Sequence, residues 1–210
     1  MSEKLPILLQ LKDKVVAIVG GGPIALRNIK RFLCVGARVV VYAERCEPEI
    51  SDLFKQGLIR LHERTLTGEE KVEADILCLA TNNRVVHEML KEANPHIFLI
   101  YDAANRFTSS FQFMNFMKER HLLVAWSTQG ASPIYAKRLK KDLKENLPIK
   151  QYNDHLAFLA KARELIQQIQ VAKIKKEQLL LAITDETFLN RADRETLLLK
   201  YLLDLTDDVK

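Results

Sequence analysis

Three consecutive glycines after an aliphatic run constrain this chain more than any other feature of its sequence. The run is Val15–Val19, and Gly20, Gly22 and Ala25 then fall at the spacing G-x-G-x-x-A, where a helical pattern begins. In a strand–turn–helix unit this spacing lets the backbone approach a pyrophosphate, whose negative charge faces the amino-terminus of the helix. We therefore expect a nicotinamide dinucleotide at this turn. The residues expected to bind it are Gly20, Gly22, Pro23 and Ile24.

Strand and helix patterns alternate from the glycine turn to about residue 108. The expected helices are 24–35, 48–56 and 85–93, and the expected buried strands are 15–19, 37–43, 74–80 and 97–101. Residues 58–64 alternate like a half-exposed strand, and residues 5–11 have the length and apolar character of an edge strand. These patterns predict an α/β fold, with a Rossmann-like parallel sheet domain over residues 1–112.

Polar residues follow three of the predicted strands at their carboxyl ends, where open parallel sheets bind their ligands. Glu44 and Arg45 follow the second strand, where an acid holds the ribose hydroxyls of NAD and a cation accommodates the 2′-phosphate of NADP; we prefer NAD. Thr81 and Asn82 follow the strand over 74–80 and can form hydrogen bonds beside the cofactor. Asp102 follows the next strand and can act as a base, an acid or a ligand to an approaching metal.

Each of these residues also has an alternative role in the local backbone. Glu44 and Arg45 can be exposed turn residues, and Asn82 with Asn83 suits an ordinary turn and helix cap. Asp102 can cap a local turn in its loop. The sequence leaves these alternatives open.

The alternation of strands and helices ends after residue 108. Residues 109–117 and 122–126 are apolar segments that predict an antiparallel pair or a strand–helix corner. A loop of small and polar residues then opens a helix that runs to about residue 145, with Ser132 as its N-cap and Pro133 at its first position. We expect a dimerisation segment over residues 113–148.

Amphipathic helices fill the remainder of the chain. No Gly or Pro occurs from Tyr152 onward, and the helical pattern is broken near 184–185 and 190–193. A lone histidine in this region, His155, is a surface or packing residue, since no metal-ligand spacing accompanies it. We expect a helical C-terminal domain over residues 149–210.

Composition excludes several classes of protein. The 210 residues are 48% hydrophobic and 28% charged, and no segment has the roughly 20 apolar residues of a membrane span or the cleavage pattern of a signal peptide, so we expect a cytoplasmic protein. The net charge of +5 is concentrated in two short segments, but no nucleic-acid-binding motif accompanies it. We expect Cys34, Cys46 and Cys78 to be reduced core residues, with neither a disulfide framework nor a metal site.

Several short motifs together resemble the precorrin-2 dehydrogenase family of sirohaem synthesis, whose bifunctional members are also sirohydrochlorin ferrochelatases. The motifs are Leu5-Pro6-Ile7, Gly20-Gly21-Gly22-Pro23-Ile24-Ala25 with Arg27, Gly36-Ala37, Leu79-Ala80-Thr81-Asn82-Asn83, Tyr101-Asp102-Ala103, and Ser127-Thr128-Gln129-Gly130-Ala131-Ser132-Pro133. Each motif is weak alone, but their order and spacing over roughly the first 150 residues are specific. Without a methyltransferase domain, the chain resembles the stand-alone enzymes.

The resemblance implies an NAD-dependent dehydrogenation of precorrin-2 to sirohydrochlorin, with or without ferrochelatase activity. Asp102 matches the family's proposed catalytic aspartate, and Ser127 and Thr128 match a loop that lies against the substrate. The substrate carries many carboxylates, which gives Lys137 and Arg138 on the basic helix an anionic partner.

The resemblance also implies a homodimer. Its interface is expected to include the apolar stretch 111–117, because this segment has too little of its own chain to bury it. Between Asn105 and Met114 the sequence departs from the family pattern, because its Phe-x-x-Pro element lacks the proline. The alternative function is a non-catalytic module that senses dinucleotides through the Rossmann domain.

Overall fold

The computed structural model describes residues 4–207, which form two compact units that divide between Phe113 and Met114. The first unit carries the glycine turn, and the second carries the basic helix and the C-terminal helices. The expected three-part division of the chain, at residues 112 and 148, stays a prediction.

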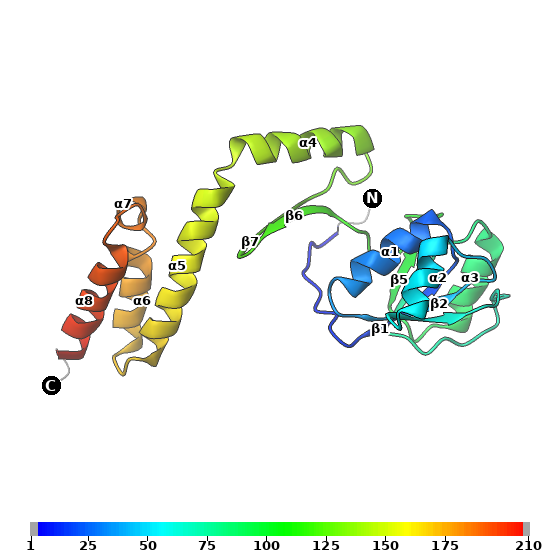
Figure 1. Cartoon of the computed structure of the whole chain (residues 1–210), viewed down its shortest axis with the longest axis horizontal. Coiled ribbons are helices and arrows are strands. Elements are labelled where there is room, and N and C mark those ends of the chain that lie inside the picture. Colours follow the sequence, from blue (N-terminus) through cyan, green and yellow to red (C-terminus); the bar gives the residue numbers. More distant parts are fainter. Residues whose placement is uncertain (1–3, 208–210) are drawn as a thin grey trace. The chain divides into compact units, whose positions relative to one another are not determined.

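The first unit is a parallel α/β sheet with the strand order β3-β2-β1-β4-β5 (Figure 1). Its strands are β1 (Val15–Val19), β2 (Arg38–Tyr42), β3 (Ile59–His62), β4 (Ile76–Leu79) and β5 (Leu99–Asp102), and its helices are α1 (Pro23–Leu33), α2 (Pro48–Lys55) and α3 (Arg84–Ala93). The predicted Rossmann-like fold is therefore confirmed. The chain extends the sheet first through β2 and β3 and then on the other side of β1 through β4, so the order reverses between β1 and β4. Open parallel sheets bind their ligands at such a reversal.

Both faces of this sheet are buried. On one face Val16 and Ile18 of β1 pack with Ile29 and Phe32 of α1, and on the other face Ala17 and Val19 pack in a core that contains Leu90 of α3. Successive residues of a strand point to opposite faces, so a strand covered on both sides must be apolar throughout. This explains why the inner strands are continuous apolar runs.

The second unit begins with an antiparallel pair and continues as helices. The pair is β6 (Asn115–Glu119) and β7 (Leu122–Trp126), which confirms the predicted antiparallel pair, although its first strand covers 115–119 rather than 109–117. The helices are α4 (Pro133–Asn146), α5 (Ile149–Gln168), α6 (Lys173–Ala182), α7 (Glu186–Leu189) and α8 (Arg194–Asp207). Ser132 caps α4 as predicted, because its side chain accepts a hydrogen bond from the backbone N–H of Tyr135.

The C-terminal helices bury a common core. Phe158 and Ile166 of α5 pack with Leu179 of α6, Phe188 of α7 and Leu202 of α8. The predicted breaks near 184–185 and 190–193 coincide with the ends of α6 and α7. His155 is a packing residue, buried on α5, as expected. Among residues 4–207, no helix combines the length and the apolar character needed to cross a bilayer.

The predicted edge strand over residues 5–11 is wrong. No strand forms there, and Leu5 and Leu8 are 83% and 82% exposed. The segment is joined to β1 by the short turn at Lys12 and Asp13. A strand in this segment could therefore pair with β1 only in the antiparallel direction. Both edges of β1 are already paired, with β2 and β4, and no place is left for it.

Two further expectations need correction. Cys34 is exposed rather than part of the core, because it is the C-cap residue of α1, although Cys78 is buried and Cys46 is partly buried. Part of the apolar stretch 111–117 also finds cover within its own chain, although Phe116 is 52% exposed. Phe111 and Phe113 pack against the first core, with the Phe113 ring 4.9 Å from that of Tyr101.

Candidate active site

The three glycines of the turn have different surroundings. Gly20 has a positive φ of 119°, and a Cβ there would lie 2.5 Å from the carbonyl oxygen of Ala80, which follows β4. A Cβ on Gly21 would overlap the carbonyl oxygen of Arg45 after β2. Gly22 has nothing within 4 Å of the position of a Cβ. The first two glycines therefore let the turn pack between neighbouring strand ends, and the third leaves open space.

This open space adjoins the amino-terminus of α1. Gly22 is the N-cap residue of α1, no side chain caps the helix, and Pro23 occupies its first turn. The backbone N–H groups of Ile24 and Ala25 therefore lack an intrahelical carbonyl partner, as in the first turn of any α-helix. Free N–H groups at a positive helix end beside an open glycine fit the pyrophosphate of a dinucleotide.

Glu44 and Arg45 lie beside the glycine turn. Both are exposed, and the segment that contains them is held to the turn where the N–H of Glu47 donates to the carbonyl of Gly21 at 2.8 Å. Thr65 approaches Glu44 at 3.5 Å, a long hydrogen bond that leaves the carboxylate largely free. The position suits contact with a ribose, and their cofactor role stays a prediction.

A buried hydrogen-bonded chain joins the ends of β4 and β5. The Oδ1 atom of Asp102 lies 2.9 Å from Nδ1 of His87, and Nε2 of the same ring lies 2.8 Å from the Thr81 hydroxyl. His87 is fully buried and Asp102 is 2% exposed, whereas Thr81 is partly exposed. Parallel pairing of β4 with β5, in which Leu79 lies opposite Asp102, brings the two strand ends together.

The Asp102 carboxylate accepts further hydrogen bonds on both oxygens. Oδ1 also accepts from the backbone N–H groups of Ala104 at 2.9 Å and Asn105 at 3.2 Å. Oδ2 accepts from the side chains of Lys91 at 2.7 Å and Thr108 at 3.3 Å. The two oxygens thus differ in their partners. Backbone N–H groups help to fix Oδ1, whereas in the described part of the chain Oδ2 accepts hydrogen bonds only from side chains, which can rotate.

These contacts determine the charge of the carboxyl group. Burial acts to raise the pKa of Asp102, but hydrogen bonds from Lys91, from the N–H of Ala104 and from His87 outweigh burial and hold the pKa below its ordinary value. Asp102 is therefore ionised at neutral pH. The alternative that Asp102 caps a local turn is also realised, since it accepts from the two backbone N–H groups that follow it.

The two asparagines after Thr81 have separate positions. Asn83 is the N-cap of α3 and accepts a hydrogen bond from the N–H of Val86. Asn82 is exposed at the end of β4. The predicted cap therefore falls on Asn83, and contact of Thr81 and Asn82 with the cofactor stays a prediction.

Sequence reasoning missed His87 and Lys91. They lie four residues apart on α3 and therefore project from one side of the helix, next to the buried Leu90. A signal was present: a histidine on the apolar face of an amphipathic helix needs a buried hydrogen-bond partner. The identity of that partner depends on how α3 packs on the sheet.

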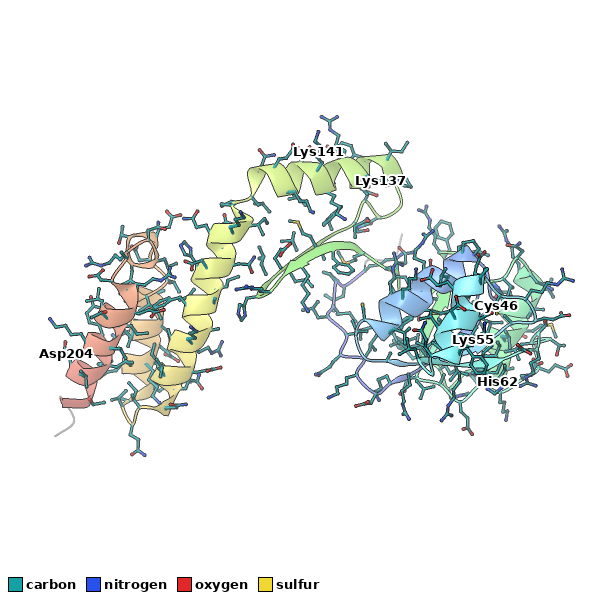
Figure 2. All side chains as sticks on the ribbon, viewed as in Figure 1. Cys46, Lys55, His62, Lys137, Lys141 and Asp204 are labelled. Atoms are coloured by element: carbon teal, nitrogen blue, oxygen red, sulfur yellow. The ribbon has the colours of Figure 1, made fainter. Side chains whose placement is uncertain are left out.

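The predicted substrate residues belong to the second unit. Ser127 accepts a hydrogen bond from the N–H of Gln129, and the Thr128 hydroxyl donates to the carbonyl of Ser132. Figure 2 shows Lys137 and Lys141 projecting from α4, and Arg138 also lies exposed on this helix. Ser127 and Thr128 thus shape the turn before α4, while the cations are accessible to an anion.

Metal-ligating side chains do not gather in the described residues. Between residues 4 and 207, no group of three or more His, Cys, Asp or Glu side chains lies close enough to hold a metal ion. The polar groups of the first unit that can support chemistry lie at the glycine turn, at the strand ends and in the buried chain from Thr81 to Asp102.

Comparisons with known proteins agree with this arrangement. Residues 7–115 match an NAD(P)-binding family, and residues 152–197 match the SirC C-terminal domain family. The precorrin-2 dehydrogenase of Priestia megaterium is 32% identical over 182 residues, which are 87% of this chain and 90% of that protein. Siroheme synthase 1 of Cronobacter sakazakii is 30% identical over 147 residues, which are 70% of this chain and 31% of that protein.

A solved structure has the same fold over nearly the whole chain. It is the structure of SirC, a precorrin-2 dehydrogenase, with a TM-score of 0.79 and 29% sequence identity. The match covers 96% of this chain and 100% of that one. The similarity therefore extends beyond the nucleotide-binding sheet to the second unit.

Proposed function

This chain belongs to the precorrin-2 dehydrogenase family, and from that premise we propose that Asp102 is its catalytic carboxylate. The protein is an NAD-dependent oxidoreductase of siroheme biosynthesis that converts precorrin-2 to sirohydrochlorin. The reaction removes one hydride and one proton from the substrate, and NAD, when bound, accepts the hydride. A basic group must therefore accept the proton that leaves the substrate.

The position of Asp102 is the observation that supports this proposal. Its carboxylate lies at the end of β5, next to the strand whose end contacts the glycine turn. Oδ2 is the oxygen that we expect to face the substrate, because Lys91 and Thr108 can rotate away from it. The low pKa keeps the carboxylate ionised and able to accept a proton or to stabilise positive charge that develops as the hydride leaves.

We propose that the cofactor lies along the glycine turn and the strand ends. Gly20 and Gly22 allow the backbone approach, and the first turn of α1, with Pro23 and Ile24, faces the pyrophosphate. Glu44 or Arg45 would contact the adenosine ribose, and Thr81 and Asn82 would contact the cofactor from the end of β4. The open space at Gly22 and the uncapped α1 support this proposal.

We propose that the substrate carboxylates bind at α4 and at the turn before it. Lys137 and Arg138 are exposed cations, and Arg138 is only loosely paired, with Asp142 at 3.8 Å. Ser127 and Thr128 would line the approach to these cations. A polycarboxylate is the ligand that such a surface favours, because several weak ion pairs act together on one molecule.

Anaerobic incubation with precorrin-2 and NAD, followed optically for sirohydrochlorin, tests the dehydrogenase assignment. We expect turnover by the wild type and a loss of at least a hundredfold in Asp102→Ala, in the range of general acid–base catalysis. Asp52→Asn is the matched control, since Asp52 is an exposed carboxylate on α2. Equal rates for Asp102→Ala and wild type would remove Asp102 from the mechanism, and NAD binding without turnover would favour the dinucleotide-sensing alternative.

We propose that the same protein also has ferrochelatase activity, which is tested separately from the dehydrogenase activity. The pyrrole protons that must leave when a metal enters sirohydrochlorin could also pass to a carboxylate such as Asp102. Fe²⁺ or Co²⁺ added to sirohydrochlorin, with and without the protein, tests this. A rate equal to the uncatalysed one would mean that the protein is a dehydrogenase alone.

We also propose that the protein is a homodimer and that it acts in the cytoplasm. A two-stranded antiparallel pair is marginal in isolation, and β6 exposes Phe116 to solvent at 52%. A second copy could cover this apolar surface. The free thiols of Cys34, Cys46 and Cys78 suit a reducing compartment. Fractionation of cells that express the tagged chain tests the location.

A further inference from the structure

We propose that His87 is a positioning residue that sets the direction of the Thr81 hydroxyl, so that Thr81 presents a hydrogen-bond acceptor to the bound dinucleotide. The inference rests on the NAD-dependent activity proposed above. It concerns a residue that does not touch the ligand and acts through Thr81. The two nitrogens of the His87 ring make hydrogen bonds to different partners.

The backbone identifies the tautomer of His87. The N–H of Thr81 lies 3.4 Å from Nε2 of His87 and can only donate, so Nε2 must be an unprotonated acceptor. Nδ1 then carries the proton and donates to Oδ1 of Asp102 at 2.9 Å. Both ring nitrogens are thus hydrogen-bonded, which satisfies the polar atoms of a fully buried side chain.

The Asp102 side of the ring is held firmly. Oδ1 also accepts from the backbone N–H groups of Ala104 and Asn105, so it does not depend on His87 for its position. Lys91 lies 2.7 Å from Oδ2 and balances the negative charge. A carboxylate fixed in this way keeps the proton of His87 on Nδ1, and therefore keeps Nε2 free to accept.

The tautomer in turn orients Thr81. Because Nε2 accepts, the Thr81 hydroxyl 2.8 Å away must donate its proton to the ring. The N–H of Asn83 fills one lone pair of the same oxygen at 3.2 Å. Within residues 4–207, the second lone pair is therefore left for a ligand, and Thr81 is partly exposed.

The ligand group that meets Thr81 must then be an O–H or N–H donor. A Cβ on Gly20 would lie 3.3 Å from the Thr81 methyl group, so Thr81 borders the glycine turn. A dinucleotide has such donors in its ribose hydroxyls and its carboxamide. A tetrapyrrole also has N–H donors, but Thr81 borders the turn at which we propose that NAD binds, so we assign the donor to NAD.

The first test needs neither turnover nor cofactor. Long-range ¹H–¹⁵N correlation spectra of the histidine rings, recorded on the free protein at neutral pH and assigned with a His87→Asn sample, report which nitrogen carries the proton. We expect Nδ1 of His87 to be protonated and Nε2 to be bare. A proton on Nε2 would overturn the inference.

The second test separates the two ends of the ring by calorimetric titration with NAD. His87→Asn keeps a donor near the position of Nδ1 and removes the acceptor for Thr81, whereas His87→Gln places a carbonyl acceptor near the position of Nε2. We expect His87→Asn to weaken NAD binding about three- to tenfold, the effect of one neutral hydrogen bond, and His87→Gln to stay within about twofold of wild type.

Variants of Thr81 keep the test decisive where a His87 variant fails to fold. We expect Thr81→Val to weaken NAD binding about as much as His87→Asn, and Thr81→Ser to bind like wild type. The double variant Thr81→Val with His87→Asn should bind no more weakly than either single variant. Unchanged affinity in Thr81→Val, or independent losses that multiply in the double variant, would overturn the inference.

Failure of the proposed function gives a different result. A protein that shows the expected tautomer and the expected NAD affinities but does not oxidise precorrin-2 would contradict the dehydrogenase assignment alone. A protein that turns over precorrin-2 with unchanged NAD affinity in both His87 variants would contradict the role of His87 alone. The KM for precorrin-2 should be the same in Thr81→Val and wild type, because the inference places the donor on the cofactor.

Discussion

Gly20 and Gly22 are two residues apart, yet they have different physical reasons to be glycine. Gly20 needs a positive φ and the close approach of the Ala80 carbonyl. Gly22 has an ordinary backbone conformation, with φ −86°, and open space where a side chain would be. At the scale of single residues, Gly20 serves the fold, and Gly22 leaves the space in which we propose that the cofactor binds.

Substitution of each glycine by alanine should separate these two roles. Gly20→Ala should lower the free energy of unfolding by about 2 kcal/mol or more, from backbone strain and overlap with Ala80. Gly22→Ala should cost less than about 1 kcal/mol but weaken NAD binding, since its methyl group would enter the space expected for the pyrophosphate. Urea unfolding and calorimetric titration measure the two quantities. Wild-type NAD affinity in Gly22→Ala would contradict the proposed cofactor position.

Because of Asp102, the stability of the first unit should decrease at acidic pH. Its pKa in the folded protein lies below its ordinary value, because Lys91, the Ala104 N–H and His87 outweigh the effect of burial. The ionised carboxylate therefore contributes its full stabilisation above a pH of about 4, and this is lost as the pH falls through the lower folded pKa.

The variant Asp102→Asn tests the predicted direction of this pH dependence. We expect it to be less stable than wild type at neutral pH and the difference to shrink as the pH falls below about 4, measured by urea unfolding at a series of pH values. A difference that widens on acidification would mean that the pKa of Asp102 is raised in the fold.

At the scale of elements, α3 connects the fold to the site. The helix covers one face of the sheet through Leu90 and carries His87 and Lys91 to Asp102 on the same side. Its first turn begins where β4 ends, so the helix cap and the partly exposed Thr81 are close neighbours. A change at the start of α3 should therefore be measurable both in stability and at the site.

Asn83→Ala should remove the cap of α3. We expect a loss of about 1 kcal/mol in the free energy of unfolding, because the N–H of Val86 loses its acceptor. Asn83→Asp should retain most of the stability, since a carboxylate can cap the same N–H and interacts well with a helix amino-terminus. Asn82→Ala, one residue earlier and exposed, is the control and should stay within about 0.5 kcal/mol of wild type. Equal losses in the two alanine variants would contradict the assignment of the cap to Asn83.

At the scale of the whole molecule, the two units differ in how their apolar surface is covered. The sheet of the first unit is covered on both faces, and it also takes up Phe111 and Phe113. The second unit exposes Phe116 on β6, Leu123 on β7 and Ile134 on α4. Exposed apolar residues on a two-stranded pair are typical of a surface that a partner covers.

The exposed apolar residues of the second unit lead us to predict a homodimer. Light scattering should report about twice the chain mass of 24.1 kDa. Phe116→Asp should shift the protein towards the monomer, because it places a charge in the proposed interface, whereas Phe54→Asp on α2 should not. A wild-type protein that remains a monomer at high concentration would contradict the homodimer.

Local sequence was sufficient for the elements and for the family. The strands, the glycine turn, the Ser132 cap and the breaks in the C-terminal helices all followed from periodicity and turn residues, which act over a few positions. The failed edge strand at 5–11 shows the limit of this reasoning. Its composition suits a strand, but whether a strand forms depends on a vacant neighbour in the sheet, and β1 has none.

The interior of the site was decided by tertiary structure alone. Thr81, His87 and Asp102 span 22 residues of sequence, and they meet because β4 pairs with β5 in one register and α3 packs across the sheet. The sequence by itself determined that polar groups would gather where these strands end. It could not determine which of them would touch, because hydrogen bonds between separate elements depend on packing geometry that has no local signature.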